Sequence, residues 1–146
     1  MFELGTDGPL VIVAGIDGSQ SSMRAGAYAA GLARRQGAKL ALVYIRPVGA
    51  GNPQVGAALA QLGAETATEL ERQIREAVDR LPTGQQVRWE FLTAEGDPYH
   101  GLVEAADRLK ADAVVIGAST SAGHRILGSV AVRLVKAGRW PVTVVP

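Results

Sequence analysis

The sequence predicts an α/β fold: a single domain with an open, five-stranded parallel sheet and helices on both faces. Short apolar runs alternate along the chain with longer segments of helical periodicity. The first two apolar runs, 10–16 and 39–45, are nearly continuous, which is typical of strands buried on both faces. Strands that alternate with helices form parallel sheets with right-handed crossovers, so we expect that arrangement here.

The first half of the chain supplies two strands and two helices. The run LVIVAGI, residues 10–16, is followed by DGSQSS, which offers several N-cap residues. Small and apolar residues recur at helical spacing over 23–37, and KLALVYI, residues 39–45, is the second strand. Gly, Pro and Asn predict a loop over 49–56. A long helix is expected over 57–81, where leucine and isoleucine recur mostly three, four, seven or eight residues apart.

The second half supplies three more strands and two more helices. Residues 87–94 alternate between apolar and polar, so one face of this strand should be wetter than the first two strands. A turn and helix start, EGDP, precede a helix over 99–111, and a buried strand follows at 112–118. After a loop rich in Gly, Ser and Thr, we expect a helix from about 127 to 137 and a last strand within 140–145.

Composition limits the class of protein. With 146 residues we expect one domain over 10–146, preceded by an N-terminal extension over 1–9. The net charge of +1 gives no reason to expect nucleic acid or an anionic membrane as a partner. The sequence has no cysteine, no signal-peptide pattern and no apolar stretch of about 20 residues. We therefore expect a soluble, cytoplasmic protein.

Several motifs of nucleotide-handling and hydrolytic enzymes are absent. No G-x-G-x-x-G follows the first strand, and no G-x-x-x-x-G-K-S/T occurs anywhere. The two histidines, His100 and His124, are interpreted as loop or helix-end residues, because nothing in their spacing suggests a Ser-His-Asp triad. Clusters with metal-ligand spacing are missing as well. The sequence therefore favours a binding protein over an enzyme.

Ligands of open parallel sheets bind outside the carboxyl ends of the strands, where the strand order reverses. In this chain that rule selects the segments 17–19, 45–46, 96–98 and 117–130. Asp17 has two interpretations that spacing alone leaves open: a hydrogen-bond acceptor for a ribose or an adenine, or the N-cap of the next helix, in competition with Ser19 or Ser21. Gly128, Ser129 and Val130 stand at a predicted helix N-terminus, where free N–H groups suit an anion.

Three long segments together resemble the universal stress protein family. They are VIVAGIDGSQSSMRAGAYAAGLARRQGAKLALVYI, EGDPYHGLVEAADRLKADAVVIGAS and ILGSVAVRLVKAGRWPVTVVP, and the resemblance extends from about Leu10 to Pro146. It implies a Rossmann-like parallel fold similar to the adenine-nucleotide α-hydrolase group. It also implies a homodimer, and some members of the family bind ATP or related adenine nucleotides.

Carried over residue by residue, the resemblance implies a nucleotide site. Asp17 would contact the ribose or adenine end, the backbone of Ile45 the adenine edge, and Gly15 and Ile16 the wall near the base. The ribose and phosphates would be held by Gly117, Gly128, Ser129 and Val130. The ATP-binding members carry Gly-x2-Gly-x9-Gly-Ser/Thr after the fourth strand. Here Thr120 stands in place of the second glycine, and only seven residues separate it from Gly128, so the loop is two residues short.

Two functional hypotheses follow, from different classes. The first is a nucleotide-binding stress sensor or regulator that takes ATP, ADP, AMP or cyclic AMP. Hydrolysis would be slow at most, and Asp17 and Ser129 would be the only evident Mg²⁺ ligands. The second is an interaction module of the same fold that binds no nucleotide and dimerises through its C-terminal strand. A true enzyme of the wider group is a third, less favoured interpretation, because DGSQSS is poorer in glycine and serine than the motif of such enzymes.

Overall fold

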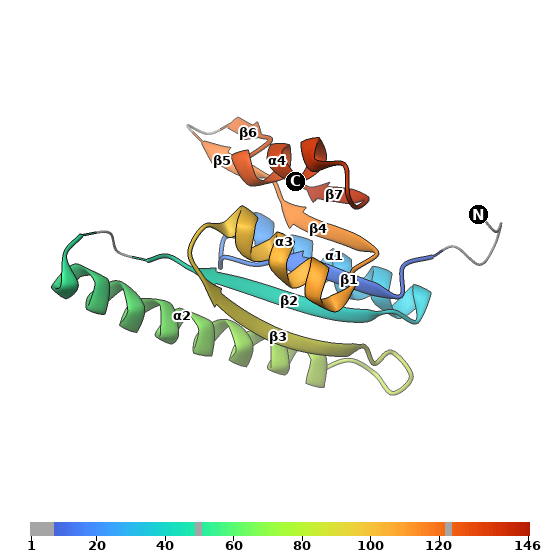
Figure 1. Cartoon of the computed structure of the whole chain (residues 1–146). Coiled ribbons are helices and arrows are strands. Elements are labelled where there is room, and N and C mark those ends of the chain that lie inside the picture. The colour runs from blue at the N-terminus through green and yellow to red at the C-terminus, as the bar shows by residue number, and fades with distance from the viewer. Residues whose placement is uncertain (1–7, 49–50, 122–123) are drawn as a thin grey trace.

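Five parallel strands form one open sheet in the order β3-β2-β1-β4-β7 (Figure 1). The computed structural model describes residues 8–48, 51–121 and 124–146. The elements are β1 (Val11–Gly15), α1 (Gln20–Gln36), β2 (Lys39–Arg46), α2 (Pro53–Asp79), β3 (Arg88–Glu95), α3 (Pro98–Leu109), β4 (Ala113–Gly117), β5 (Ser119–Ser121), β6 (His124–Ile126), α4 (Ser129–Ala137) and β7 (Val142–Val145). The predicted α/β fold class and parallel sheet are confirmed.

The continuous apolar runs of the sequence are the central strands. β1 pairs with β2 on one side and with β4 on the other, with Val13 opposite both Ala41 and Val114. All three of these side chains are fully buried. The alternating strand, β3, lies at the edge of the sheet and pairs only with β2, and several of its residues are exposed. Burial on both faces therefore explains why only the central strands lack alternation.

Helices cover both faces of the sheet, as the sequence predicts. On one face, Ile12 and Ala14 of β1 pack in a core with α1 and with Ile74 of α2. On the other face, Val13 packs with α3 and with Leu134 of α4. The alternation of side chains along a strand explains why neighbouring residues of β1 belong to different cores.

The long second helix begins earlier than its apolar periodicity predicts. The expected loop over 49–56 ends at Asn52, whose side-chain oxygen accepts hydrogen bonds from the backbone N–H of Gln54 (2.9 Å) and Val55 (3.4 Å). Pro53 occupies the first helical position, where its missing N–H costs nothing. Figure 1 shows the amino-terminal half of α2 extending past the carboxyl end of β2.

The loop after β4 contains structure that the sequence did not predict. β5 and β6 pair as an antiparallel two-stranded sheet, with Ser119 opposite Ile126 and Thr120 opposite Arg125. The last helix accordingly starts at Ser129 rather than near residue 127, with Gly128 as its N-cap. The start of α4 is thereby placed next to the carboxyl end of β4.

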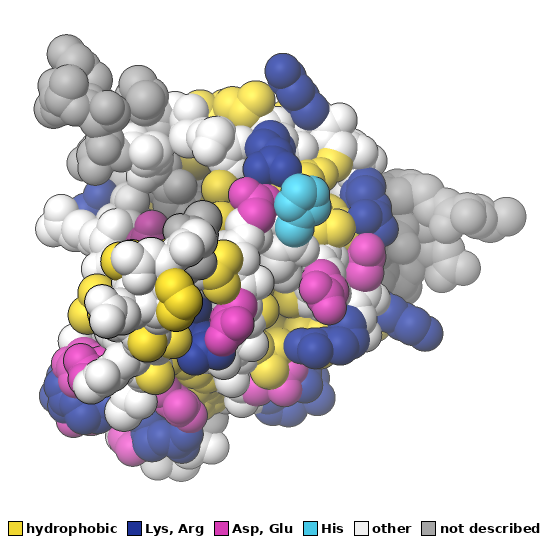
Figure 2. Space-filling model, turned by 60° about the vertical axis from the view of Figure 1, so that its left-hand side comes forward, with side chains coloured by type: hydrophobic (Ala, Val, Ile, Leu, Met, Phe, Trp, Pro, Cys, Tyr) yellow, Lys and Arg dark blue, Asp and Glu magenta, His cyan; other side chains and the backbone are white. Residues whose placement is uncertain are grey.

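The surface carries charges of both signs. Figure 2 shows acidic and basic side chains interspersed over the visible face, with apolar side chains between them. Within the described ranges, none of the helices has both the length and the apolar composition needed to cross a membrane.

Candidate functional site

A pocket of about 380 Å³ opens at the carboxyl ends of β1 and β4. The sheet order changes direction between these two strands, because β2 follows β1 on one side and β4 lies on the other. The pocket is lined by Gly15, Ile16, Asp17, Ser19, Ser21, Ser22, Val43, Ile45, Pro98, Leu102, Ile116, Gly117, Ala118, Ser119, Gly128, Ser129, Val130 and Ala131. The location is the one that the switch-point rule predicts for a ligand.

The turn from β1 into α1 rules out one of the two interpretations of Asp17, the N-cap, and leaves its contact with a ligand a prediction. Ser19 is the N-cap of α1, and its side-chain oxygen accepts a hydrogen bond from the backbone N–H of Ser22 at 3.2 Å. Asp17 lies outside the helix, and its Oδ1 accepts from the backbone N–H of Ser19 at 2.8 Å. Asp17 is therefore not the N-cap of α1, and its carboxylate lines the pocket.

Asp17 remains ionised at neutral pH. Burial raises the pKa of this carboxyl, but hydrogen bonds from Ser19 and Ser22 favour the charged form and outweigh burial, so the pKa is lowered overall. Asp17 is also the only charged residue among the described residues that line the pocket. A negatively charged acceptor thus faces this space without a basic side chain beside it in the described lining.

This lowered pKa predicts a specific pH dependence for Asp17→Asn. Because the folded-state pKa lies below the ordinary value of about 3.9, the stabilising contribution of the carboxylate is complete above that value. It is lost as the pH falls through the folded-state pKa. We expect the difference in unfolding free energy between wild type and Asp17→Asn to stay constant from about pH 5 to 8 and to shrink below about pH 4. Urea denaturation at each pH measures it. A difference that grows on acidification would show that burial dominates instead.

The opposite wall of the pocket is the start of α4. Gly128 is the N-cap and has no side chain that could bond to the helix, so the first N–H groups of α4 lack a side-chain acceptor. Gly128 also lets β5 approach, because a Cβ here would lie 2.9 Å from the Cβ of Ser119. Ser129 and Val130 line the pocket from this helix end. Free N–H groups at the positive end of a helix dipole suit an anionic group such as a phosphate.

The wall formed by β2 and α3 is apolar. Ile45 stands at the end of β2 beside Leu102 of α3, and Val43 and Pro98 complete this side. A Cβ at Gly101 would collide with the side chain of Ile45, so that glycine allows α3 to lie directly against the end of β2. The pocket is thus apolar on one side and polar on the other, as is usual for small-molecule sites.

Eight of the nine predicted site residues line this one pocket: Gly15, Ile16, Asp17, Ile45, Gly117, Gly128, Ser129 and Val130. The ninth, Thr120, belongs to β5, and its side chain is outside the described part of the structure, as are those of His124 and Arg125. The sequence did not single out Ser22, Val43, Leu102 or Ser119. Of these, only Ser119 carried a signal, since it stands within the selected segment 117–130.

The described side chains of this pocket are too few to hold a metal ion by themselves. In the ranges that the structure describes, no group of three or more His, Cys, Asp and Glu side chains is placed to hold a metal ion. Asp17 and Ser129 both line the pocket. A Mg²⁺ ion here would therefore depend on phosphate oxygens of a ligand for most of its coordination.

Comparison with known proteins gives the family. The Universal stress protein family matches residues 10–146. Universal stress protein MJ0531 of Methanocaldococcus jannaschii is 31% identical over 140 residues, which cover 92% of this chain and 80% of that protein. Universal stress protein UspA of Lactobacillus plantarum has a similar fold, with a TM-score of 0.79, 24% identity and coverage of 93% of this chain and 97% of that chain.

A universal stress protein in complex with cAMP is also similar in structure. It has a TM-score of 0.70 and 28% identity, and the match covers 94% of this chain and 97% of that chain. The match to the family profile extends over the whole parallel sheet and both layers of helices described above. The chain belongs to the universal stress protein family.

Proposed function

We propose that this protein binds an adenine nucleotide in the switch-point pocket and acts as a stress-response sensor or regulator. One observation carries the proposal: the ionised Asp17 and the N-terminus of α4 line the same pocket of about 380 Å³. A nucleotide needs an acceptor for its ribose hydroxyls and donors for its phosphate, and these two groups provide them. The relative that binds cAMP supports the choice of an adenine nucleotide.

In this proposal each wall of the pocket has one task. The Asp17 carboxylate accepts a hydrogen bond from a ribose hydroxyl, while Ile45 and Gly15 border the base. The N–H groups at the start of α4 and the hydroxyl of Ser129 donate to the phosphate. Gly117 lines the pocket at the end of β4, where the resemblance assigns it to ribose and phosphate contacts.

The charges favour one phosphate over three. The described lining of the pocket contains Asp17 and no lysine, arginine or histidine. A triphosphate carries more negative charge than a monophosphate, and neutral donors and one helix terminus compensate the larger charge less well. We therefore propose that AMP and cyclic AMP bind more tightly than ADP or ATP·Mg²⁺. No general base accompanies Asp17 in the described lining, so we propose binding without catalysis.

A thermal-shift panel with AMP, cyclic AMP, ADP and ATP·Mg²⁺ tests the proposal. A ligand at a hundred times its Kd adds about 2.7 kcal/mol of stability, which is roughly 5–11 °C for a domain near this size. We expect the largest shift with a monophosphate, and we expect Asp17→Ala and Gly128→Val to remove it. Asp79→Ala, at the end of α2, is the matched control and should keep the full shift. No shift at millimolar nucleotide, or an equal shift in Asp17→Ala, would refute the proposal.

Dimerisation through β7 is a second proposal, and the sheet topology favours it. β7 is an edge strand that pairs with β4 on one side, and the described residues place no strand on its other side. An edge of this kind can pair with a second copy across a two-fold axis. Sedimentation equilibrium at micromolar concentration should give twice the chain mass. If the protein sediments as a monomer, the proposed dimer does not form.

A further inference from the structure

A second groove lies on the sheet face covered by α1 and α2, and its volume of about 370 Å³ is similar to that of the nucleotide pocket. It is lined by Ile16, Met23, Gly26, Ala27, Ala30, Gly31, Arg34, Leu40, Leu42, Gln73, Ile74, Ala77, Val78, Leu81, Gln85, Val87 and Trp89. Only Ile16 also lines the nucleotide pocket. This volume lies in the range of small-molecule sites, about 300–1,000 Å³.

The groove lies beside Gly26 of α1, which does not reach α2. An ideal Cβ at Gly26 would meet only Leu42 (3.7 Å) and Ile16 (3.9 Å), both of which form the floor. No atom of α2 lies within 4 Å of that position. Small residues usually allow two helices to approach each other closely, but here they border an open space instead. Leu40 and Leu42 of β2 form part of the floor, and Ile74 belongs to α2. All three are buried, so the groove lies above a packed core.

The groove is long, and its two ends differ in polarity. It follows α1 from Met23 to Arg34, which is about 16 Å along the helix axis. Near Met23 the surroundings are apolar, because this side chain also packs against Tyr44, Ala67 and Leu70. At the other end, Arg34 and Gln85 line the groove. Such a shape suits a linear molecule with an apolar tail and a polar head.

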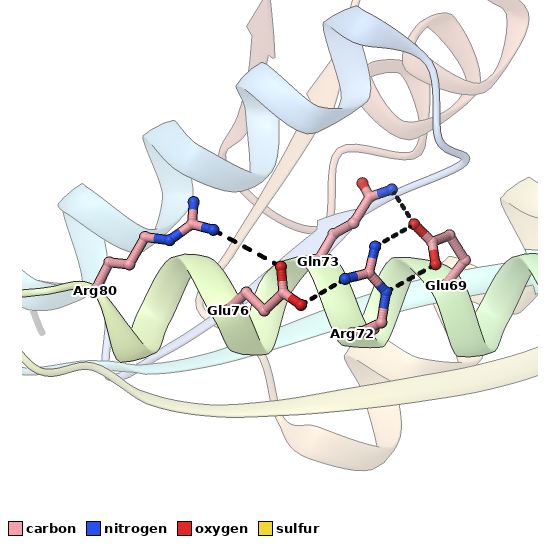
Figure 3. Close-up of polar contacts among 5 residues, drawn as sticks. All are labelled: Glu69, Arg72, Gln73, Glu76 and Arg80. Carbon is pink, nitrogen blue, oxygen red and sulfur yellow. Dashed lines mark hydrogen bonds and ion pairs between the residues drawn. The ribbon is translucent and has the colours of Figure 1, made fainter.

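The charge at the polar end favours an anionic head. The cations of α2 are already paired on their own helix: Arg72 bonds Glu69 at 2.7 Å, and Arg80 lies 3.8 Å from Glu76 (Figure 3). Arg75 pairs with Glu71 at 3.1 Å. By contrast, Arg34 forms no ion pair with any residue in the described ranges. Its guanidinium can therefore bind a carboxylate in the bidentate geometry that arginine prefers.

We propose that this groove binds a free fatty acid, with the acyl chain between α1 and α2 and the carboxylate on Arg34. The tail would cover the floor and the small residues of α1, and the head would remain at the surface beside Gln85. This ligand is independent of the nucleotide, because the two pockets share only one residue.

Isothermal titration of the protein with dodecanoate below its micellar concentration tests the proposal. We expect saturable binding with one site per chain, and weaker binding of dodecanol, which has the same tail without the charge. Arg34→Gln should weaken dodecanoate binding by about tenfold or more. Arg35→Gln removes the same charge from the same helix end but does not line the groove, and it should change the affinity by less than about twofold.

A second pair of variants tests the tail site. Ala30→Leu places a larger side chain in the groove and should abolish binding. Ala27→Leu does the same from an exposed position, where folding is not at risk. Cyclic AMP should not displace dodecanoate, because the linings of the two pockets share only Ile16. Absence of saturable binding, equal affinities in Arg34→Gln and Arg35→Gln, full affinity in both leucine variants, or displacement by cyclic AMP would each overturn the proposal.

Discussion

Gly117→Ala is expected to lower the free energy of unfolding by about 3 kcal/mol, because the added methyl group has no space. An ideal Cβ at Gly117 would lie 2.5 Å from the carbonyl carbon of Ser21 and 2.6 Å from the backbone nitrogen of Ser22. These are backbone atoms of the first turn of α1, so no side-chain rotation can relieve the collision. α1 and β4 would have to move apart. The melting temperature should fall by about 6–12 °C.

Gly26→Ala is the matched control. Gly26 lies in α1, the helix that Gly117 contacts. A Cβ added there would make only ordinary contacts, at 3.7 Å with Leu42 and 3.9 Å with Ile16. Because alanine favours the helix by up to about 1 kcal/mol relative to glycine, the control should melt at or above the wild-type temperature. Urea denaturation of both variants measures the difference. If Gly117→Ala retains wild-type stability, α1 and β4 are not in this close contact.

The contact at Gly117 also shapes the switch-point pocket. By bringing the first turn of α1 against the end of β4, it places Ser21 and Ser22 at the same pocket as the start of α4. The resemblance assigned Gly117 to ribose and phosphate contacts, and that assignment stays a prediction. The packing role is additional and does not depend on any ligand. A loss of nucleotide binding in Gly117→Ala could therefore come from disturbed packing or from a lost ligand contact. Asp17→Ala, which adds no atoms, separates these two causes.

The sequence predicted the strands and helices that a short stretch of residues marks by its own pattern. The central strands could be identified because burial on both faces leaves a continuous apolar run, as over 10–16 and 39–45. The start of α2 was missed because the glycines of 49–56 outweighed a correct local signal, the N-cap Asn52 followed by Pro53. The β5–β6 hairpin was missed because its strands are three residues long, too short for any periodicity to show.

The residues of the site that stand at the carboxyl ends of strands could be predicted from the sequence. The switch-point rule requires only the order of strands and helices, so Asp17, Ile45 and Gly117 could be named from the sequence. The role of Asp17 could not, because aspartate and serine are both good N-caps at this spacing. Backbone geometry shows which residue is the cap: Ser19 has the extended conformation of an N-cap, with φ −66° and ψ 155°. The contact of Asp17 with a ligand stays a prediction. Leu102 could not be found at all, since only the packing of α3 against β2 brings it to the pocket.

Leu134→Ala is expected to destabilise the protein by about 3 kcal/mol and to weaken the response to nucleotide as well. Leu134 is 0% exposed and anchors α4 in the core that it shares with Val13 and Val114. α4 has nine residues, too few to be stable without tertiary packing. Removing its main anchor should therefore loosen the helix whose N-terminus borders the switch-point pocket. The melting temperature should fall by about 6–12 °C.

Val135→Ala is the control on the same helix, at a side chain that is 53% exposed. It should change the melting temperature little, because the loss of exposed apolar surface is small and alanine is the better helix former. Melting both variants with and without AMP separates the two effects. We expect Leu134→Ala to melt early and to show a smaller shift with AMP, and Val135→Ala to keep both values. Equal losses of melting temperature and of AMP shift in the two variants would show that α4 does not depend on its buried face. The packing of Leu134 would then not be what holds the start of α4 at the pocket.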